Sequence, residues 1–175
     1  MKNLMNKLKK SDLADKITLI VAMILLVILF GSLNPNYVTS SNLTNILIAC
    51  SLTGFVAIGE TNLIIAGQND LSAGSVAACA GVLAAILVRM GVPVVLAILI
   101  AVLVGCLVGA INAALVTMLN LQPFIATLAT MSVARGAAYI LCNGKAVAIS
   151  DKTFIRLGNY RIFGFLPLPV LLLLI

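Results

Sequence analysis

Long apolar runs separated by short polar stretches dominate this sequence. Five runs approach the length of a membrane-crossing helix, and a sixth begins near residue 166. None of them alternates apolar and polar residues as the strands of a membrane barrel do, so the pattern predicts helices. We expect an all-α fold, a polytopic helical membrane protein with about five full spans and the start of a sixth. The five predicted spans are residues 17–33, 46–66, 73–88, 92–118 and 123–142.

Composition supports the membrane interpretation. The chain has 175 residues, of which 62% are hydrophobic and 9% are charged. Soluble domains carry about 25% charged residues. The deficit in charge favours a protein that exposes apolar side chains to lipid over one that folds in water.

Basic residues gather before the first apolar run. They are Lys2, Lys7, Lys9, Lys10 and Lys16. Because basic flanks of membrane segments stay in the cytoplasm, we expect residues 1–16 to form a cytoplasmic basic N-terminus and residues 17–175 to form a membrane domain. A secretory signal peptide is the alternative, but the apolar run is longer than a usual signal core and no A-x-A site follows it. The net charge of +6 lies at membrane edges, so nucleic acid is not expected as a partner.

Two predicted segments are short. Residues 167–175 would make about 14 Å of helix, against a hydrocarbon core of about 30 Å. We therefore expect the sequence to stop inside a membrane span, as a fragment or a truncated protein would. Residues 73–88 are also short for a full crossing, and a re-entrant segment there would change the topology.

Several kinds of chemistry lack the residues that they need. The chain has no histidine, and its four cysteines lie in apolar segments without CxxC spacing. We therefore expect no metal site, no cofactor and no histidine-based catalysis. Gly144 and Lys145 form the one Gly-Lys pair, which lacks the upstream glycine of a phosphate loop. Neither an enzyme nor ATP binding by this chain is expected.

A polar patch at residues 67–75 interrupts the apolar pattern. Its sequence is Gly-Gln-Asn-Asp-Leu-Ser-Ala-Gly-Ser. In a membrane, such a patch must leave the bilayer or line a wet space. Asp70 can cap the start of the following helix or contact a solute, and the sequence leaves both interpretations open.

Other unusual residues lie inside the apolar runs. Glu60 and Arg135 are isolated charges that could pair with each other, reach an interface or line a cavity. Gly105, Gly109 and Ala113 form a stripe of small residues, which predicts a close approach of another helix, within one subunit or between two.

Two stretches resemble motifs of one family. Residues 59–75 resemble the motif G-x-T-x-V-I-I-T-G-G-I-D-L-S-V-G-S, and residues 109–136 contain a counterpart of G-x-I-N…P-P-F-I-A-T-L-G-T-M…R-G. Both motifs belong to the permeases of ribose-type ABC sugar importers, a branched-chain-amino-acid-permease-like membrane family. The positions at which this sequence differs from the two motifs affect the expected choice of solute and leave the expected fold unchanged. They are Ala66, Gln68, Asn69, Gln122 and Ala129.

The resemblance implies a multi-pass permease subunit in the bacterial cytoplasmic (inner) membrane. It would pair with a second permease subunit and receive a monosaccharide-like solute from an extracytoplasmic solute-binding protein. A separate cytoplasmic ATP-binding subunit would drive it, and no cofactor is implied. We expect the residues that line or brace the pathway to be Asn69, Asp70, Ser72, Asn112, Thr127 and Thr130.

Two other functions remain open at this stage. One is an ion-coupled secondary transporter, in which Glu60 or Asp70 would act as the coupling carboxylate near a broken helix. The other is a non-functional permease fragment.

Overall fold

The computed structural model describes residues 2–162 and 166–174, with side chains described from Lys16 onward. The predicted all-α fold is confirmed, and within the described ranges the strands are limited to the short antiparallel pair β1 (Arg161–Ile162) and β2 (Leu166–Pro167). The helices are α1 (Lys2–Leu33), α2 (Ser40–Ile65), α3 (Ala73–Arg89), α4 (Val94–Thr117), α5 (Pro123–Leu141), α6 (Lys152–Gly158) and α7 (Leu168–Leu174).

Four helices are long and apolar enough to cross a membrane. Their candidate spans are Lys16–Leu33, Ser40–Ile65, Val94–Thr117 and Pro123–Leu141. α3 has 17 residues, about 25 Å of helix. The structure therefore contains four full-length candidates and a shorter fifth helix, where the sequence predicted about five full spans. Large apolar side chains on α4 such as Leu103 and Leu107 are exposed, as expected where lipid covers a helix.

The described chain divides into two compact units, one up to Leu47 and one from Ile48 onward. In the first unit, α1 ends at a turn that contains Asn34, Pro35 and Asn36, residue types that are typical of turns. The Asn36 N–H donates to Asn34 Oδ1 at 2.9 Å, and the rings of Phe30 and Tyr37 pack with their centroids 5.6 Å apart. The turn is thus held by contacts between residues close together in the sequence.

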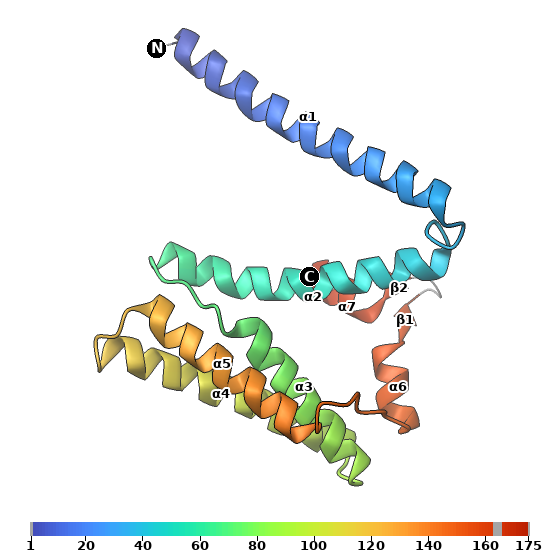
Figure 1. The fold of residues 1–175 in the computed structure, drawn as a ribbon, viewed down its shortest axis with the longest axis vertical. Coiled ribbons are helices and arrows are strands. Elements are labelled where there is room, and N and C mark those ends of the chain that lie inside the picture. The colour runs from blue at the N-terminus through green and yellow to red at the C-terminus, as the bar shows by residue number, and fades with distance from the viewer. Residues whose placement is uncertain (1, 163–165, 175) are drawn as a thin grey trace. The chain divides into compact units, whose positions relative to one another are not determined.

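In the second unit, α3 packs against both α4 and α5 (Figure 1). Short loops join these helices, so consecutive helices run antiparallel. A small core of Val88, Val94 and Ala97 lies where α3 meets α4, and Phe154 of α6 packs against it. The loops at residues 66–72 and 118–122 consequently lie at one end of the three helices, and the loop at residues 90–93 lies at the other.

Gly67 ends α2 and redirects the chain toward α3. Its φ is +73°, in the left-handed region that favours glycine. The Gln68 N–H donates to the Leu63 carbonyl at 2.9 Å, and the Gly67 N–H donates to the Ile64 carbonyl at 2.9 Å. These two bonds form a Schellman motif, which satisfies the last carbonyls of the helix. The polar residues that follow are thereby placed at the ends of the neighbouring helices.

Candidate functional site

A cavity of about 380 Å³ lies where four helices end. Most of its lining surface is apolar, but several polar side chains border it, and we refer to it as the polar cavity. It is bounded by the C-terminal parts of α2 and α4, the residues that precede α3, and the start of α5. Its lining residues are Leu63, Ala66, Gln68, Asn69, Asp70, Gly109, Asn112, Ala113, Val116, Thr117, Pro123 and Thr127. The polar patch therefore borders a hollow at one end of the helices.

A chain of hydrogen bonds ties the residues before α3 to α4. Ser72 donates to Asp70 Oδ1 through its backbone N–H at 2.7 Å and through its hydroxyl at 2.6 Å. The same hydroxyl oxygen accepts a hydrogen bond from Asn112 Nδ2 at 2.9 Å. Ser72 and Asn112 are buried, with 1% and 6% of their surfaces exposed. One serine thus connects a carboxylate on the α2–α3 loop to an amide 40 residues away.

The two interpretations of Asp70 are compatible in this geometry. Asp70 lies two residues before the N-cap residue Ser72, whose own side chain makes no capping bond. The carboxylate accepts the Ser72 N–H, and its charge suits the positive end of α3. Asp70 also lines the polar cavity, so it organises the helix start and borders the hollow at the same time.

Glu60 lies near Asp70, and its Oε2 accepts the Asp70 backbone N–H at 3.4 Å. Among the described side chains, no ion pair joins Glu60 to Arg135, so the structure does not form that possible pair. Arg135 instead lines a different cavity beside Ser75 and Met131. The physical reason is axial offset, because Arg135 lies eight residues past Thr127, about 12 Å along α5 from the polar cavity.

The two threonines on α5 have different positions. Thr127 is 4% exposed and lines the polar cavity, with its hydroxyl donating to the Pro123 carbonyl at 2.9 Å. The Thr130 hydroxyl donates to the Thr127 carbonyl at 3.0 Å, and Thr130 does not line this cavity. A hydroxyl that donates its proton to its own helix cannot donate to a solute, although its oxygen can still accept a hydrogen bond.

The structure thus brings four of the six expected pathway residues to one cavity: Asn69, Asp70, Asn112 and Thr127. Ser72 lines an adjacent cavity together with Asp70. Sequence reasoning did not select Gln68 and Thr117, which also line the polar cavity. Both could have been selected from the sequence, because Gln68 is the neighbour of Asn69 and Thr117 is a polar residue in the nearly apolar α4.

The stripe of small residues on α4 borders two hollows within this chain. A Cβ built on Gly105 or Gly109 would meet no atom within 4 Å in the described residues. Gly109 and Ala113 instead border the polar cavity, and Gly105 borders the adjacent one. The missing side chains widen these hollows, and the close approach of a helix from a second subunit stays a prediction.

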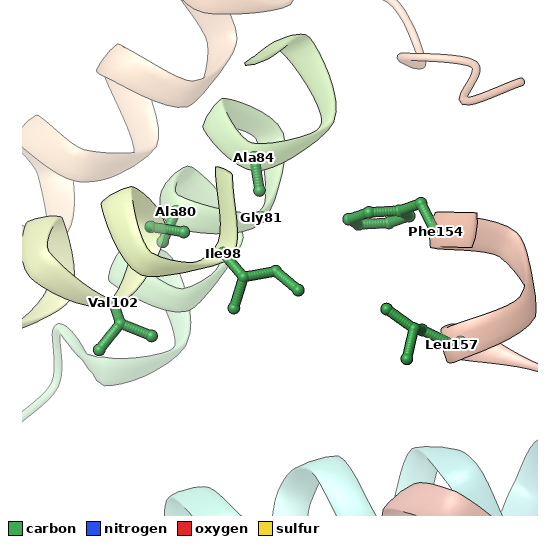
Figure 2. A pocket seen from close by; sticks show the side chains of 9 residues that line it. Ala80, Gly81, Ala84, Ile98, Val102, Phe154 and Leu157 are labelled. Atoms are coloured by element: carbon green, nitrogen blue, oxygen red, sulfur yellow. The ribbon is translucent and has the colours of Figure 1, made fainter. Parts of the chain in front are cut away.

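A second hollow of about 380 Å³ is wholly apolar. Figure 2 shows Phe154 and Leu157 of α6 facing Ala84 and Ile98 across it. The remaining lining residues are Ala80, Gly81, Ala101, Val102 and Gly158. Burying hydroxyl groups against such a surface is unfavourable, so this hollow does not suit a sugar.

The polar cavity offers hydrogen-bond acceptors and a negative charge. Asp70 is its charged lining residue, and no lysine or arginine is among the residues that line it. The described part of the chain contains no group of three metal-ligating side chains. The cavity therefore suits a neutral solute that donates hydrogen bonds better than it suits an anion.

Comparisons with known proteins agree with the motifs in the sequence. Residues 42–174 match the family described as branched-chain amino acid transport system, permease component. The chain is 40% identical over 156 residues to the L-arabinose transport system permease protein AraH of Escherichia coli strain K12, covering 89% of this chain and 47% of AraH.

Two other relatives carry the names of different sugars. The chain is 36% identical over 163 residues to the D-allose transport system permease protein AlsC of Escherichia coli strain K12, covering 92% of this chain and 50% of AlsC. It is 33% identical over 154 residues to the ribose import permease protein RbsC of Haemophilus influenzae, covering 86% of this chain and 47% of RbsC. The chain spans about half the length of these curated relatives. No solved structure matches it.

Proposed function

We propose that this chain acts as the permease subunit of an ATP-binding-cassette importer. The chain belongs to the family described as branched-chain amino acid transport system, permease component. Its solute is a monosaccharide-like molecule, which crosses the bacterial cytoplasmic membrane. The family match and the names of the curated relatives support this assignment. The span-capable helices support a multi-pass location in that membrane.

The chemistry of the polar cavity carries the choice of a sugar over an amino acid. An amino acid brings an ammonium group, which Asp70 could attract, and also a carboxylate, for which no lysine or arginine lines the cavity. A sugar brings hydroxyl groups, which can donate to carboxylate and amide oxygens. The cavity volume of about 380 Å³ lies within the usual range for small-molecule sites.

The other parts of the importer are separate proteins in this proposal. The sequence after α5 contains Gly144 and Lys145 without the rest of a phosphate loop, which supports ATP hydrolysis on another subunit. A second permease subunit completes the pathway, and an extracytoplasmic binding protein delivers the solute. The permease itself performs no bond-breaking chemistry.

Uptake measurements test this proposal. Cells that express the intact importer should accumulate radiolabelled L-arabinose, D-ribose or D-allose above cells that lack the gene, and they should not accumulate leucine above that background. Accumulation should stop when ATP is depleted and persist when an uncoupler collapses the ion gradients at constant ATP.

Two outcomes would contradict it. Uptake that follows the ion gradient and ignores ATP would identify an ion-coupled transporter. Uptake of leucine without any of the sugars would identify an amino acid permease.

A further inference from the structure

One group in the polar cavity has unused hydrogen-bonding capacity. Asn112 is 6% exposed, and its Oδ1 is buried without a hydrogen-bond partner. A buried acceptor without a donor is costly, and folded proteins keep few of them. Asn112 is also a lining residue of the cavity, so its unpaired oxygen lies beside a hollow large enough for a small solute.

The Asn112 amide cannot relieve this cost by turning over. An ionised carboxylate only accepts hydrogen bonds, so the one hydroxyl proton of Ser72 points to Asp70 Oδ1. The Ser72 oxygen is left as an acceptor, and it needs the NH₂ group of Asn112 as its donor. The charge on Asp70 therefore fixes the orientation of the Asn112 amide through Ser72, without a direct contact between Asp70 and Asn112.

The nearby hydroxyls are not available as donors. Thr117 donates to the Ala113 carbonyl at 2.7 Å, and Thr127 donates to the Pro123 carbonyl at 2.9 Å. Both share the cavity wall with Asn112. A donor for Asn112 Oδ1 can thus come from a molecule that enters the cavity.

We propose that Asn112 determines which solutes this permease accepts, by receiving a hydrogen bond at Oδ1 from a solute hydroxyl. Ser72 is the positioning residue that holds the amide in the receiving orientation. This inference rests on the proposed sugar-permease function. The oxygen is shut off from solvent in this structure, so the hydroxyl reaches it when the cavity wall moves to admit the solute. The solute class is neutral and polyhydroxylated, with a donor at one defined ring position.

Transport kinetics with deoxy sugars test the inference. In cells that express the intact importer, Asn112→Leu removes the acceptor at similar volume. Its KM for the transported sugar should rise about ten- to a hundredfold, because a buried hydrogen bond is lost. In the natural protein, one monodeoxy analogue of that sugar should show a similar rise in KM. In the Asn112→Leu variant, the sugar and that analogue should have the same KM, because the contact that distinguishes them is absent.

The matched control is Asn62→Leu, the same change at an exposed amide that donates to its own helix at Ile58. It should leave the KM ratio between sugar and analogue as it is in the natural protein. Ser72→Ala tests the positioning role, because it frees the amide to turn. For the Ser72→Ala protein that reaches the membrane, the KM ratio between the sugar and its analogue should fall, whereas a general loss of structure would lower Vmax and leave that ratio as it is.

The possible outcomes separate the two proposals. If the natural protein transports a sugar and Asn112→Leu keeps the full KM ratio, the inference about Asn112 is wrong and the proposed function stands. If Asn112→Leu does not reach the membrane, the KM values of the natural protein for the monodeoxy analogues provide the test. Equal KM values for all of these analogues would overturn the inference. If the natural protein transports no sugar, the proposed function fails first and this inference fails with it.

Discussion

At the scale of single residues, Ser72 makes the longest-range connection in the polar site. Its hydroxyl both donates to Asp70 and accepts from Asn112, and 1% of the residue is exposed. Removing it leaves the Asn112 NH₂ group and one Asp70 oxygen without this partner.

We predict that Ser72→Ala lowers the free energy of unfolding by about 1–2 kcal/mol, because a buried donor loses its acceptor. Ser132→Ala is the control, since Ser132 is exposed and its hydroxyl donates to its own helix at Leu128. The control should change stability by less than about 0.5 kcal/mol. Thermal unfolding of the detergent-solubilised protein provides the measurement, and equal shifts for the two variants would show that the Ser72 bridge contributes nothing.

Residue type and position predicted part of the site. Asn69, Asp70, Asn112 and Thr127 were selected because they are polar residues in or beside apolar runs, and they line one cavity. The same reasoning suggested a Glu60–Arg135 pair that the structure does not form. Whether two charged side chains meet depends on the axial offset and the rotation of their helices. The position of a charged residue in the sequence gives neither of these.

At the scale of secondary structure, a proline and a glycine lie at two helix ends. α5 begins at Pro123, as its fixed φ favours, and α2 ends just before Gly67. Hydropathy placed the first helix start at residue 17 and the second at residue 46, whereas α1 begins at Lys2 and α2 at Ser40. Lysine is a good helix former, so a helix continues past the apolar segment that enters the membrane.

Two glycines of the same region should respond in opposite ways to the same substitution. An added Cβ has open space at Gly67 and at Gly59, but Gly67 alone of the two has a positive φ, +73°. Gly67→Ala should therefore lower the free energy of unfolding by about 1–2 kcal/mol. Gly59→Ala lies inside α2 and should leave stability unchanged or raise it by up to about 1 kcal/mol.

Chemical or thermal unfolding of both variants in the same detergent makes the comparison. A Gly67→Ala protein as stable as the Gly59→Ala protein would mean that the left-handed turn after α2 does not hold the chain in place.

At the scale of the whole molecule, the described chain buries little of its apolar surface. The buried core is a small cluster around Val88, Val94 and Ala97, and the candidate spans are at most 17% buried inside the structure. Sequence composition predicted this lipid-facing character. It did not predict that the polar patch lines a cavity at one end of the helices, because that arrangement follows from the antiparallel packing of α3, α4 and α5.

The antiparallel packing predicts which loops share a side of the membrane. In a protein whose four cysteines are replaced by alanine, single cysteines are introduced at Ala66, Met90 and Leu119. If α3 and α4 both cross, Ala66→Cys and Leu119→Cys should react with a membrane-impermeant maleimide from one side and Met90→Cys from the other. With the N-terminus in the cytoplasm, Met90→Cys is the variant labelled in intact cells.

Cell lysis before labelling serves as the control, because all three cysteines should then react. Labelling of Ala66→Cys and Met90→Cys from the same side would mean that α3 enters and leaves the membrane without crossing it.

The shortness of α3 has a consequence for the surrounding membrane. Its 17 residues span about 25 Å, against a hydrocarbon layer of about 30 Å. If α3 crosses the membrane, as the labelling experiment tests, lipid tails beside it must compress, at a fraction of a kcal/mol for each Å of mismatch, or water must fill the difference. In both cases the insulating layer is thinnest next to α3. For the proposed solute, the dielectric barrier is therefore lowest along α3, the helix that begins directly after Ser72.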